Sequence, residues 1–217
     1  MSYVTPSPIS TDAAERICRR FGIDQVRFTN SGTESTMYAV RVARSASGKS
    51  DIVKVEGGYH GSYDPFVVSS KPKVESAGDA EFPTAVTDSN LVTGNVFVVP
   101  YNNPESLEAI FEKYSATIAC FIVEPVLENI GIVLPDAGYL ERVRELCDQY
   151  GIILIFDEVK TGLTAGHQGA AQRLGVQPDL ITLAKSIGGG LTLAAFGGKQ
   201  KYMDYVTNGK MAHFGTF

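Results

Sequence analysis

The amino-acid sequence predicts an α/β fold, and two observations carry that prediction. Short apolar runs rich in β-branched residues alternate along the chain with amphipathic stretches of helical period. Two of these runs, IACFIV at 118–123 and IILIF at 152–156, are apolar throughout. Such runs are typical of parallel strands covered on both faces, so we expect these two strands at the centre of the sheet.

The expected elements follow one another in order along the chain. The strand-like runs are VRFTN, DIVKVEG, VFVVP, IACFIVEP, IILIFDEV and LITLAK, and the helix-like stretches are TESTMYAVRVARSA, PESLEAIFEKYS and AGYLERVRELCDQYG. Asn103 and Pro104 are typical of the start of a helix. Asp136 can cap the next helix, and Gly151 follows the end of that helix as a C-terminal glycine. Segment 69–95 has no regular pattern and is too long for an ordinary connection, so we expect a functional surface loop there.

The composition is that of one soluble globular domain. The chain has 217 residues, of which 44% are hydrophobic and 20% are charged, so it can bury a substantial core. Its formal net charge is -5, and no run of Lys or Arg provides a basic surface. We therefore expect no nucleic-acid partner.

The sequence also argues against membrane, disulfide and metal sites. The opening MSYVTPSP lacks the basic and apolar regions of a leader peptide, and no apolar run approaches the roughly 18 residues that span a bilayer. Cys18, Cys120 and Cys147 lie far apart with no CxxC pair, and the three histidines are dispersed. We expect a cytoplasmic protein with no membrane contact, no metal and thiols without a chemical role.

Chemistry is expected in the residues just after the apolar runs, because ligands of open α/β sheets bind beyond the carboxyl ends of the strands. Here these residues are polar, charged or glycine-rich. They are Ser31-Gly32-Thr33, Gly57-Gly58-Tyr59-His60-Gly61, Glu124-Pro125, Asp157-Glu158 and Lys185-Ser186.

Asp157 and Glu158 follow a run that is predicted to be wholly buried. Taking an unpaired carboxylate out of water costs several kcal/mol or more, so at least one of these acids needs a cation, several donors or solvent. Neighbouring side chains on a strand point to opposite faces, so only one of the two acids can face a given pocket.

Ser31, Gly32 and Thr33 stand at the expected start of a helix. Two hydroxyls, free backbone N–H groups and the positive end of the helix dipole suit a phosphate group at this position. An ordinary helix cap explains the same residues, and on these residues alone it is the more common interpretation.

Lys185 directly follows the apolar run LITLA and precedes Ser-Ile-Gly-Gly-Gly. Most lysines are solvated surface groups, but a desolvated lysine loses its proton readily and can form a Schiff base. Pyridoxal phosphate needs such a lysine, an acid at its ring nitrogen and a phosphate-binding turn, and the chain has one candidate for each. We expect Asp157 to be the acid, ionised against the protonated ring nitrogen.

Six motifs together carry a family resemblance. SGTE, GGYHG, EP followed by ENIG, FDEVKTG, PDLITLAKSIGGG and HFGTF occur in this order. From about Asp12 to Phe217 the chain resembles the class III pyridoxal-phosphate aminotransferases, and most closely the branch that contains glutamate-1-semialdehyde 2,1-aminomutase. The resemblance implies the large domain of fold type I, with a mostly parallel sheet in a three-layer α/β/α arrangement. It also implies transfer of an amino group between a small-molecule amino donor and a carbonyl acceptor.

The resemblance assigns roles residue by residue. Lys185 would hold the cofactor and carry the proton, Asp157 would pair with the ring nitrogen, and Glu124 and Glu158 would be architectural acids. The other implied cofactor contacts are Ser31, Gly32 and Thr33 at the phosphate, Tyr59 and Val159 on the two ring faces, Asn129 at the ring hydroxyl, and Thr216 at the phosphate of a partner subunit in a homodimer whose active site lies at the interface. As alternatives, Tyr59 could be ordinary core packing, and Asn129 could simply adopt a left-handed turn conformation.

Several departures from the family pattern limit these assignments. Leu163 and Thr164 occupy positions where the family often has an aromatic residue and an arginine, and Thr192 replaces a usual proline. Members also have sequence before and after these motifs, so we expect residues 1–217 to be a central fragment, incomplete at both ends and inactive alone. A racemase or decarboxylase on the same scaffold, or a catalytically idle dimerisation domain, remains as an alternative function.

Overall fold

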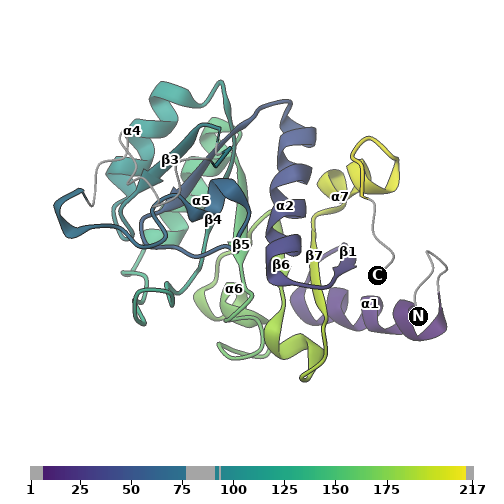
Figure 1. Ribbon diagram of the computed structural model, residues 1–217. Helices are drawn as coiled ribbons and strands as arrows, with labels where there is room; N and C mark the ends of the chain where they lie inside the picture. Colours follow the sequence, from purple (N-terminus) through teal and green to yellow (C-terminus); the bar gives the residue numbers. More distant parts are fainter. Residues whose placement is uncertain (1–6, 77–90, 93, 214–217) are drawn as a thin grey trace.

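A seven-stranded sheet forms the centre of the molecule in the computed structural model, which describes residues 7–76, 91–92 and 94–213 (Figure 1). The strands are β1 (Gln25–Thr29), β2 (Asp51–Val55), β3 (Val96–Val99), β4 (Ile118–Val123), β5 (Ile153–Asp157), β6 (Leu180–Leu183) and β7 (Ala194–Gly198). Their spatial order is β1-β7-β6-β5-β4-β2-β3. All neighbouring pairs are parallel except those of β7, which runs antiparallel to both β6 and β1.

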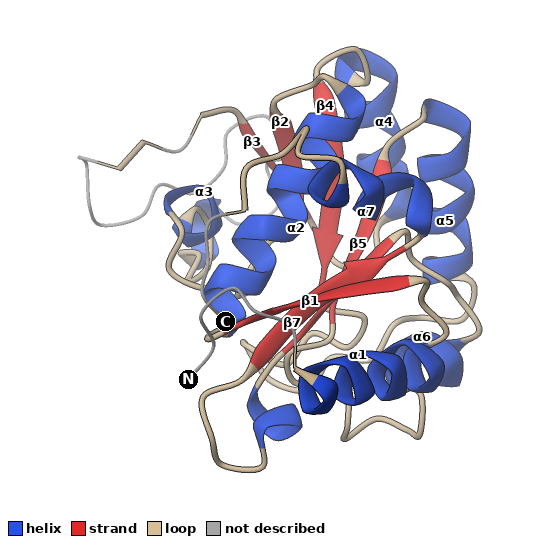
Figure 2. Cartoon of the chain, turned by 90° about the vertical axis from the view of Figure 1, so that its right-hand side faces the viewer, coloured by secondary structure: helices blue, strands red, loops and turns tan. Residues whose placement is uncertain are grey.

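Helices cover both faces of this sheet. They are α1 (Pro8–Phe21), α2 (Gly32–Ser47), α3 (Asp64–Val67), α4 (Pro104–Tyr114), α5 (Tyr139–Tyr150), α6 (Gly169–Leu174) and α7 (Gln200–Thr207), with short 3-10 helices η1 (Val74–Ser76) and η2 (Lys185–Gly188). One core cluster joins the sheet to α1, α4, α5 and α6, and a second joins it to α2, α3 and α7. Figure 2 shows the sheet between these two groups of helices. The expected three-layer arrangement is confirmed.

The two central strands were predicted correctly. Every residue of β4 and of β5 is buried, and each strand has a parallel neighbour on both sides. Unbroken apolarity therefore marked strands that contact helices on both faces.

None of the described helices is long and apolar enough to cross a membrane.

The helix boundaries were predicted in part. Asn103 caps α4 by accepting a hydrogen bond from the Ser106 N–H, and Gly151 ends α5 in a left-handed conformation, as expected. The prediction for Asp136 was wrong, because α5 is preceded by Gly138, which has no side chain to cap it. Strand β7 and helices α1, α3, α6 and α7 were not among the expected elements. Most of segment 69–95 lies outside the described residues.

Candidate functional site

A cavity of about 340 Å³ lies at the carboxyl edge of the parallel strands. Loops that follow β1, β2, β4, β5 and β6 meet there, as expected for an open α/β sheet. The lining residues are Asn30, Ser31, Gly32, Thr33, Thr36, Tyr59, His60, Gly61, Glu124, Asp157, Val159, Lys160, Ala184, Lys185, Gly190, Leu191, Thr192 and Leu193. Seven of the nine residues to which the resemblance assigns a cofactor contact line this cavity.

Ser31 and Glu34 cap helix α2 reciprocally. The Ser31 Oγ accepts a hydrogen bond from the Glu34 N–H at 3.2 Å, and the Glu34 carboxylate accepts from the Ser31 N–H at 3.1 Å. The ordinary cap interpretation of Ser31 is therefore seen directly. The backbone N–H groups of Gly32 and Thr33, the first two residues of α2, have no acceptor within the described part of the chain, and they remain able to bind an anion.

Two glycines let backbone segments approach closely beside this helix end. A Cβ on Gly32 would lie 3.2 Å from two Val159 methyl carbons, and a Cβ on Gly61 would lie 2.5 Å from Thr33 Oγ1. Thr33 Oγ1 also accepts a hydrogen bond from the Ser62 N–H at 3.2 Å. The loop after β2 is therefore docked directly on the start of α2, and no larger residue fits at Gly61.

Asp157 lies at the end of β5 and is held by three donors. Its Oδ1 accepts hydrogen bonds from the Val159 N–H and the Thr182 hydroxyl, both at 3.1 Å. Its Oδ2 lies 2.8 Å from His60 Nδ1, and the two side chains are only 4% and 0% exposed. An ionised carboxylate only accepts, so the hydrogen of this bond belongs to His60. A carboxylate has about four acceptor sites, so one remains for a cationic N–H donor in the cavity.

Tyr59 and Glu124 also line the cavity and are joined by a hydrogen bond. The Tyr59 side chain is partly exposed, and its N–H donates to Glu124 Oε1 at 2.9 Å. Glu124 Oε2 accepts a second hydrogen bond from the Glu128 N–H at 3.1 Å. Burial raises the pKa of Glu124, although His60 and these two N–H donors act in the opposite direction. Glu124 thus fixes the backbone of the loop that carries Tyr59, in the architectural role that was expected.

Glu158 faces away from the cavity. Its carboxylate accepts hydrogen bonds from the Thr161 hydroxyl at 2.6 Å and from the N–H groups of Ala170 and Ala171 at 2.8 Å. Burial raises the pKa of Glu158, while these three donors lower it. The adjacent acids therefore have different surroundings: Asp157 lines the cavity, and Glu158 holds the first turn of α6.

Lys185 lines the cavity at the first position of η2. Its φ of 50° lies in the left-handed region, which costs a non-glycine residue roughly 1–2 kcal/mol. Such strain is concentrated at functional sites. The expected desolvation was wrong, because β6 ends at Leu183 and Lys185 already belongs to the exposed turn that follows.

Asn129 does not line the cavity. Its Nδ2 donates to the backbone carbonyls of Gly57, at 2.8 Å, and of Ser70, at 3.0 Å, so it ties together both ends of the loop after β2. It is not among the described non-glycine residues with positive φ, so the left-handed alternative was wrong. A contact between Asn129 and a cofactor stays a prediction. Thr216 lies outside the described residues.

Lys54 was missed at the sequence level. It is fully buried in β2, and its Nζ donates to the carbonyls of Gly58 at 2.8 Å, Phe66 at 3.1 Å and Val68 at 2.6 Å. Burial lowers the pKa of Lys54 to about 7, against the opposing charges of Glu124 and Glu56. A lysine inside an apolar strand was the available signal, because such a charge must find buried partners.

Known proteins resemble this chain in sequence and in overall fold. The family model for aminotransferase class-III matches residues 2–217. The chain is 44% identical to glutamate-1-semialdehyde 2,1-aminomutase of Methanospirillum hungatei over 99% of this chain and 51% of that relative. An omega-transaminase from Sphaerobacter thermophilus has a TM-score of 0.92 at 35% identity, over 100% of this chain and 51% of that chain. The chain spans about half the length of the relatives it matches.

The chain also resembles a third protein, a transaminase whose structure was solved with pyridoxal phosphate (PLP) bound. It has a TM-score of 0.89 and 34% identity, over 99% of this chain and 51% of that chain. The predicted fold class is therefore confirmed by its likeness to solved transaminases. Within the described residues, no group of His, Cys, Asp and Glu side chains could hold a metal ion.

Proposed function

Because the chain belongs to the class-III aminotransferases, we propose that residues 1–217 form the cofactor-binding domain of a PLP enzyme that moves an amino group between an amine or amino acid and a carbonyl compound. One observation carries this proposal. Lys185, Asp157 and the free N–H groups at the start of α2 line the same cavity. These are the amine, the acid and the anion site that PLP requires.

Each element of the cavity has a distinct task in this proposal. When bound, PLP supplies an aldehyde for amine exchange and a ring that withdraws electrons from the substrate carbon. Lys185 would hold the cofactor through its amine, and the same amine would take up and return the substrate proton. Asp157 keeps a proton on the ring nitrogen, and the N–H groups of Gly32 and Thr33 bind the phosphate. Val159 and Tyr59 hold the ring from its two faces.

The relatives suggest two finer features of the whole protein. Because the curated relative is named for a semialdehyde aminomutase, an aminomutase of this kind is the nearest specific activity that we propose. We also propose a homodimer in which the active site is completed at the interface, and sedimentation of the cofactor-loaded protein tests this. A monomer that carries cofactor at full occupancy would contradict the shared site.

Borohydride reduction of the PLP-loaded chain tests the proposed function. We expect the reduced pyridoxyl group on Lys185, and peptide mapping by mass spectrometry locates it. Lys185→Ala should show no label while it keeps the wild-type unfolding midpoint, because Lys185 is exposed and lies in a turn. Lys160 also lines the cavity and serves as the internal comparison. A label on Lys160, or no label at all, would contradict the proposal, and the second result would favour a catalytically idle domain.

A further inference from the structure

The cavity wall carries four charged side chains, and two of them already have partners. They are Glu124, Asp157, Lys160 and Lys185. Both oxygens of Glu124 accept backbone N–H donors, and both oxygens of Asp157 accept donors from His60, Val159 and Thr182. Neither acid forms an ion pair with Lys160. Two lysines therefore line a cavity in which neither acid forms an ion pair with a described lysine.

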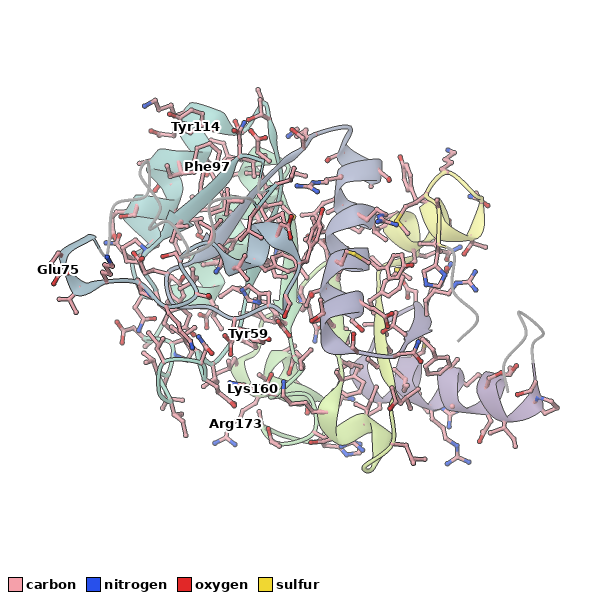
Figure 3. All side chains as sticks on the ribbon, in the orientation of Figure 1. Tyr59, Glu75, Phe97, Tyr114, Lys160 and Arg173 are labelled. Carbon is pink, nitrogen blue, oxygen red and sulfur yellow. The ribbon has the colours of Figure 1, made fainter. Side chains whose placement is uncertain are left out.

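Lys160 is firmly placed on this wall. The preceding residue, Val159, packs against Gly32, and the Lys160 carbonyl accepts a hydrogen bond from the Thr164 hydroxyl at 2.7 Å. The Gly162 N–H closes the same turn on the Glu158 carbonyl at 2.8 Å. These contacts fix the backbone from which the lysine side chain extends. Figure 3 shows Lys160 and Tyr59 near one another in the view, and both line the cavity.

The Lys160 ammonium has no anionic partner among the described residues. The residue is half-buried, and no described residue forms an ion pair or hydrogen bond with its Nζ. A lysine ammonium is a compact point charge with three N–H donors, which suits a carboxylate that enters the cavity. In the proposed function, the start of α2 would hold the phosphate and Lys185 would hold the aldehyde end of the cofactor. Lys160 is then the remaining cation of the cavity wall, and it can bind an anion other than the phosphate.

We propose that Lys160 binds the carboxylate of the substrate, so that the enzyme acts on amino acids and oxo acids rather than on simple amines. This inference rests on the proposed function and names the substrate class of the same site. The two lysines then have different roles: Lys185 transfers the proton of the amino-bearing carbon, and Lys160 binds the carboxylate of the substrate.

Absorbance titration of the PLP-loaded chain tests this inference. The ligands are alanine, β-alanine and 4-aminobutyrate, each compared with ethylamine or propylamine, the amine that lacks its carboxylate. Lys160→Met should weaken binding of at least one of the amino acids about tenfold or more, as expected for a lost charged hydrogen bond, and should leave the simple amines unchanged. Lys160→Arg should retain most of the affinity. Lys71→Met, an exposed lysine outside the cavity, should change nothing.

Several outcomes would overturn the inference. One is an equal loss of affinity for amino acids and simple amines in Lys160→Met, or no loss of affinity for either. Another is a wild-type chain that carries the borohydride label at Lys185 but binds neither amino acids nor simple amines. If Lys160→Met weakens binding of PLP but not of pyridoxal, the lysine binds the cofactor phosphate instead. Missing borohydride label at Lys185 would remove the proposed function and this inference together, whereas label at Lys185 without carboxylate selectivity would remove this inference alone.

Discussion

His60 and Asp157 form a buried pair, in which His60 Nδ1 lies 2.8 Å from Asp157 Oδ2. The residues are separated by 97 positions: His60 lies in the loop that follows β2, and Asp157 is the last residue of β5. His60 Nε2 is also buried and has no hydrogen-bond partner within the described part of the chain. The imidazole therefore makes its one polar contact with the acid that we assign to the cofactor ring, which makes it a positioning residue.

Replacing His60 with Phe keeps a flat ring but removes the donor to Asp157. We expect the unfolding free energy to fall by about 1–3 kcal/mol, because one oxygen of a buried carboxylate loses its partner. PLP affinity should fall as well, since Asp157 loses a donor that orients it. Urea unfolding and a PLP fluorescence titration measure the two effects. Phe66→Leu is the control: its ring centroid lies 5.8 Å from that of His60, so it should lower stability alone. Equal PLP affinity in His60→Phe and wild type would contradict the positioning role.

Asp157→Asn should mainly slow the reaction with amines, whereas Glu158→Gln should mainly lower the stability of the fold. Asn at 157 cannot hold the ring-nitrogen proton by its charge, so we expect amine-driven absorbance changes of the PLP-loaded chain to slow by about two orders of magnitude or more. Gln at 158 places an NH2 group against donors that now meet a carboxylate. It should lower stability by about 1–3 kcal/mol with little effect on that rate. Stopped-flow absorbance and urea unfolding test the pair, and similar rate losses in both variants would mean that the acids are assigned wrongly.

Lys54 should make stability rise with pH above neutrality. Its pKa is about 7 in the folded chain and near 10.4 when unfolded, so the unfolded state binds more protons between these values. The contribution of Lys54 to the unfolding free energy is fully present above the unfolded pKa and is lost as pH falls to about 7. The expected slope is about 1.4 kcal/mol per pH unit. Urea unfolding at pH 7.5, 8.25 and 9 measures it, and Lys54→Met should remove this part of the slope. An unchanged slope in Lys54→Met would show that Lys54 keeps its ordinary pKa.

Gly61→Ala should damage the site, whereas Gly131→Ala should not. Both glycines have positive φ, 101° and 133°, so both substitutions strain the backbone by roughly 1–2 kcal/mol. Only at Gly61 would the new Cβ also meet Thr33, at 2.5 Å from Oγ1 and 2.8 Å from Cα, whereas Gly131 has open space. We expect PLP affinity to fall in Gly61→Ala and to stay unchanged in Gly131→Ala. Equal affinities in a fluorescence titration would show that this close approach does not shape the phosphate site.

The expected placement of the site residues follows from a local pattern combined with a general rule of α/β sheets. Lys185, Asp157 and Gly32 each follow an apolar run, and the carboxyl ends of parallel strands meet at one edge. They do line one cavity. Which polar groups contact one another there was not predictable in the same way. The bond between His60 and Asp157, and the three carbonyls around Lys54, depend on how the loop after β2 folds back over the sheet.

The sequence by itself determined the central strands and several helix ends, because burial on both faces and helix capping leave patterns within a few residues. β4 and the Asn103 cap of α4 show this. Only the tertiary structure decided the place of β7, whose sequence AAFGG has no β-branched residue. A Cβ at Gly197 would lie 2.4 Å from the Gln25 carbonyl oxygen, and one at Gly198 would lie 2.2 Å from that of Asp179. β7 lies between β1, which is distant in sequence, and β6, which precedes it in the chain, and these two strands approach so closely that only glycine fits at positions 197 and 198. No local pattern records the contact with β1.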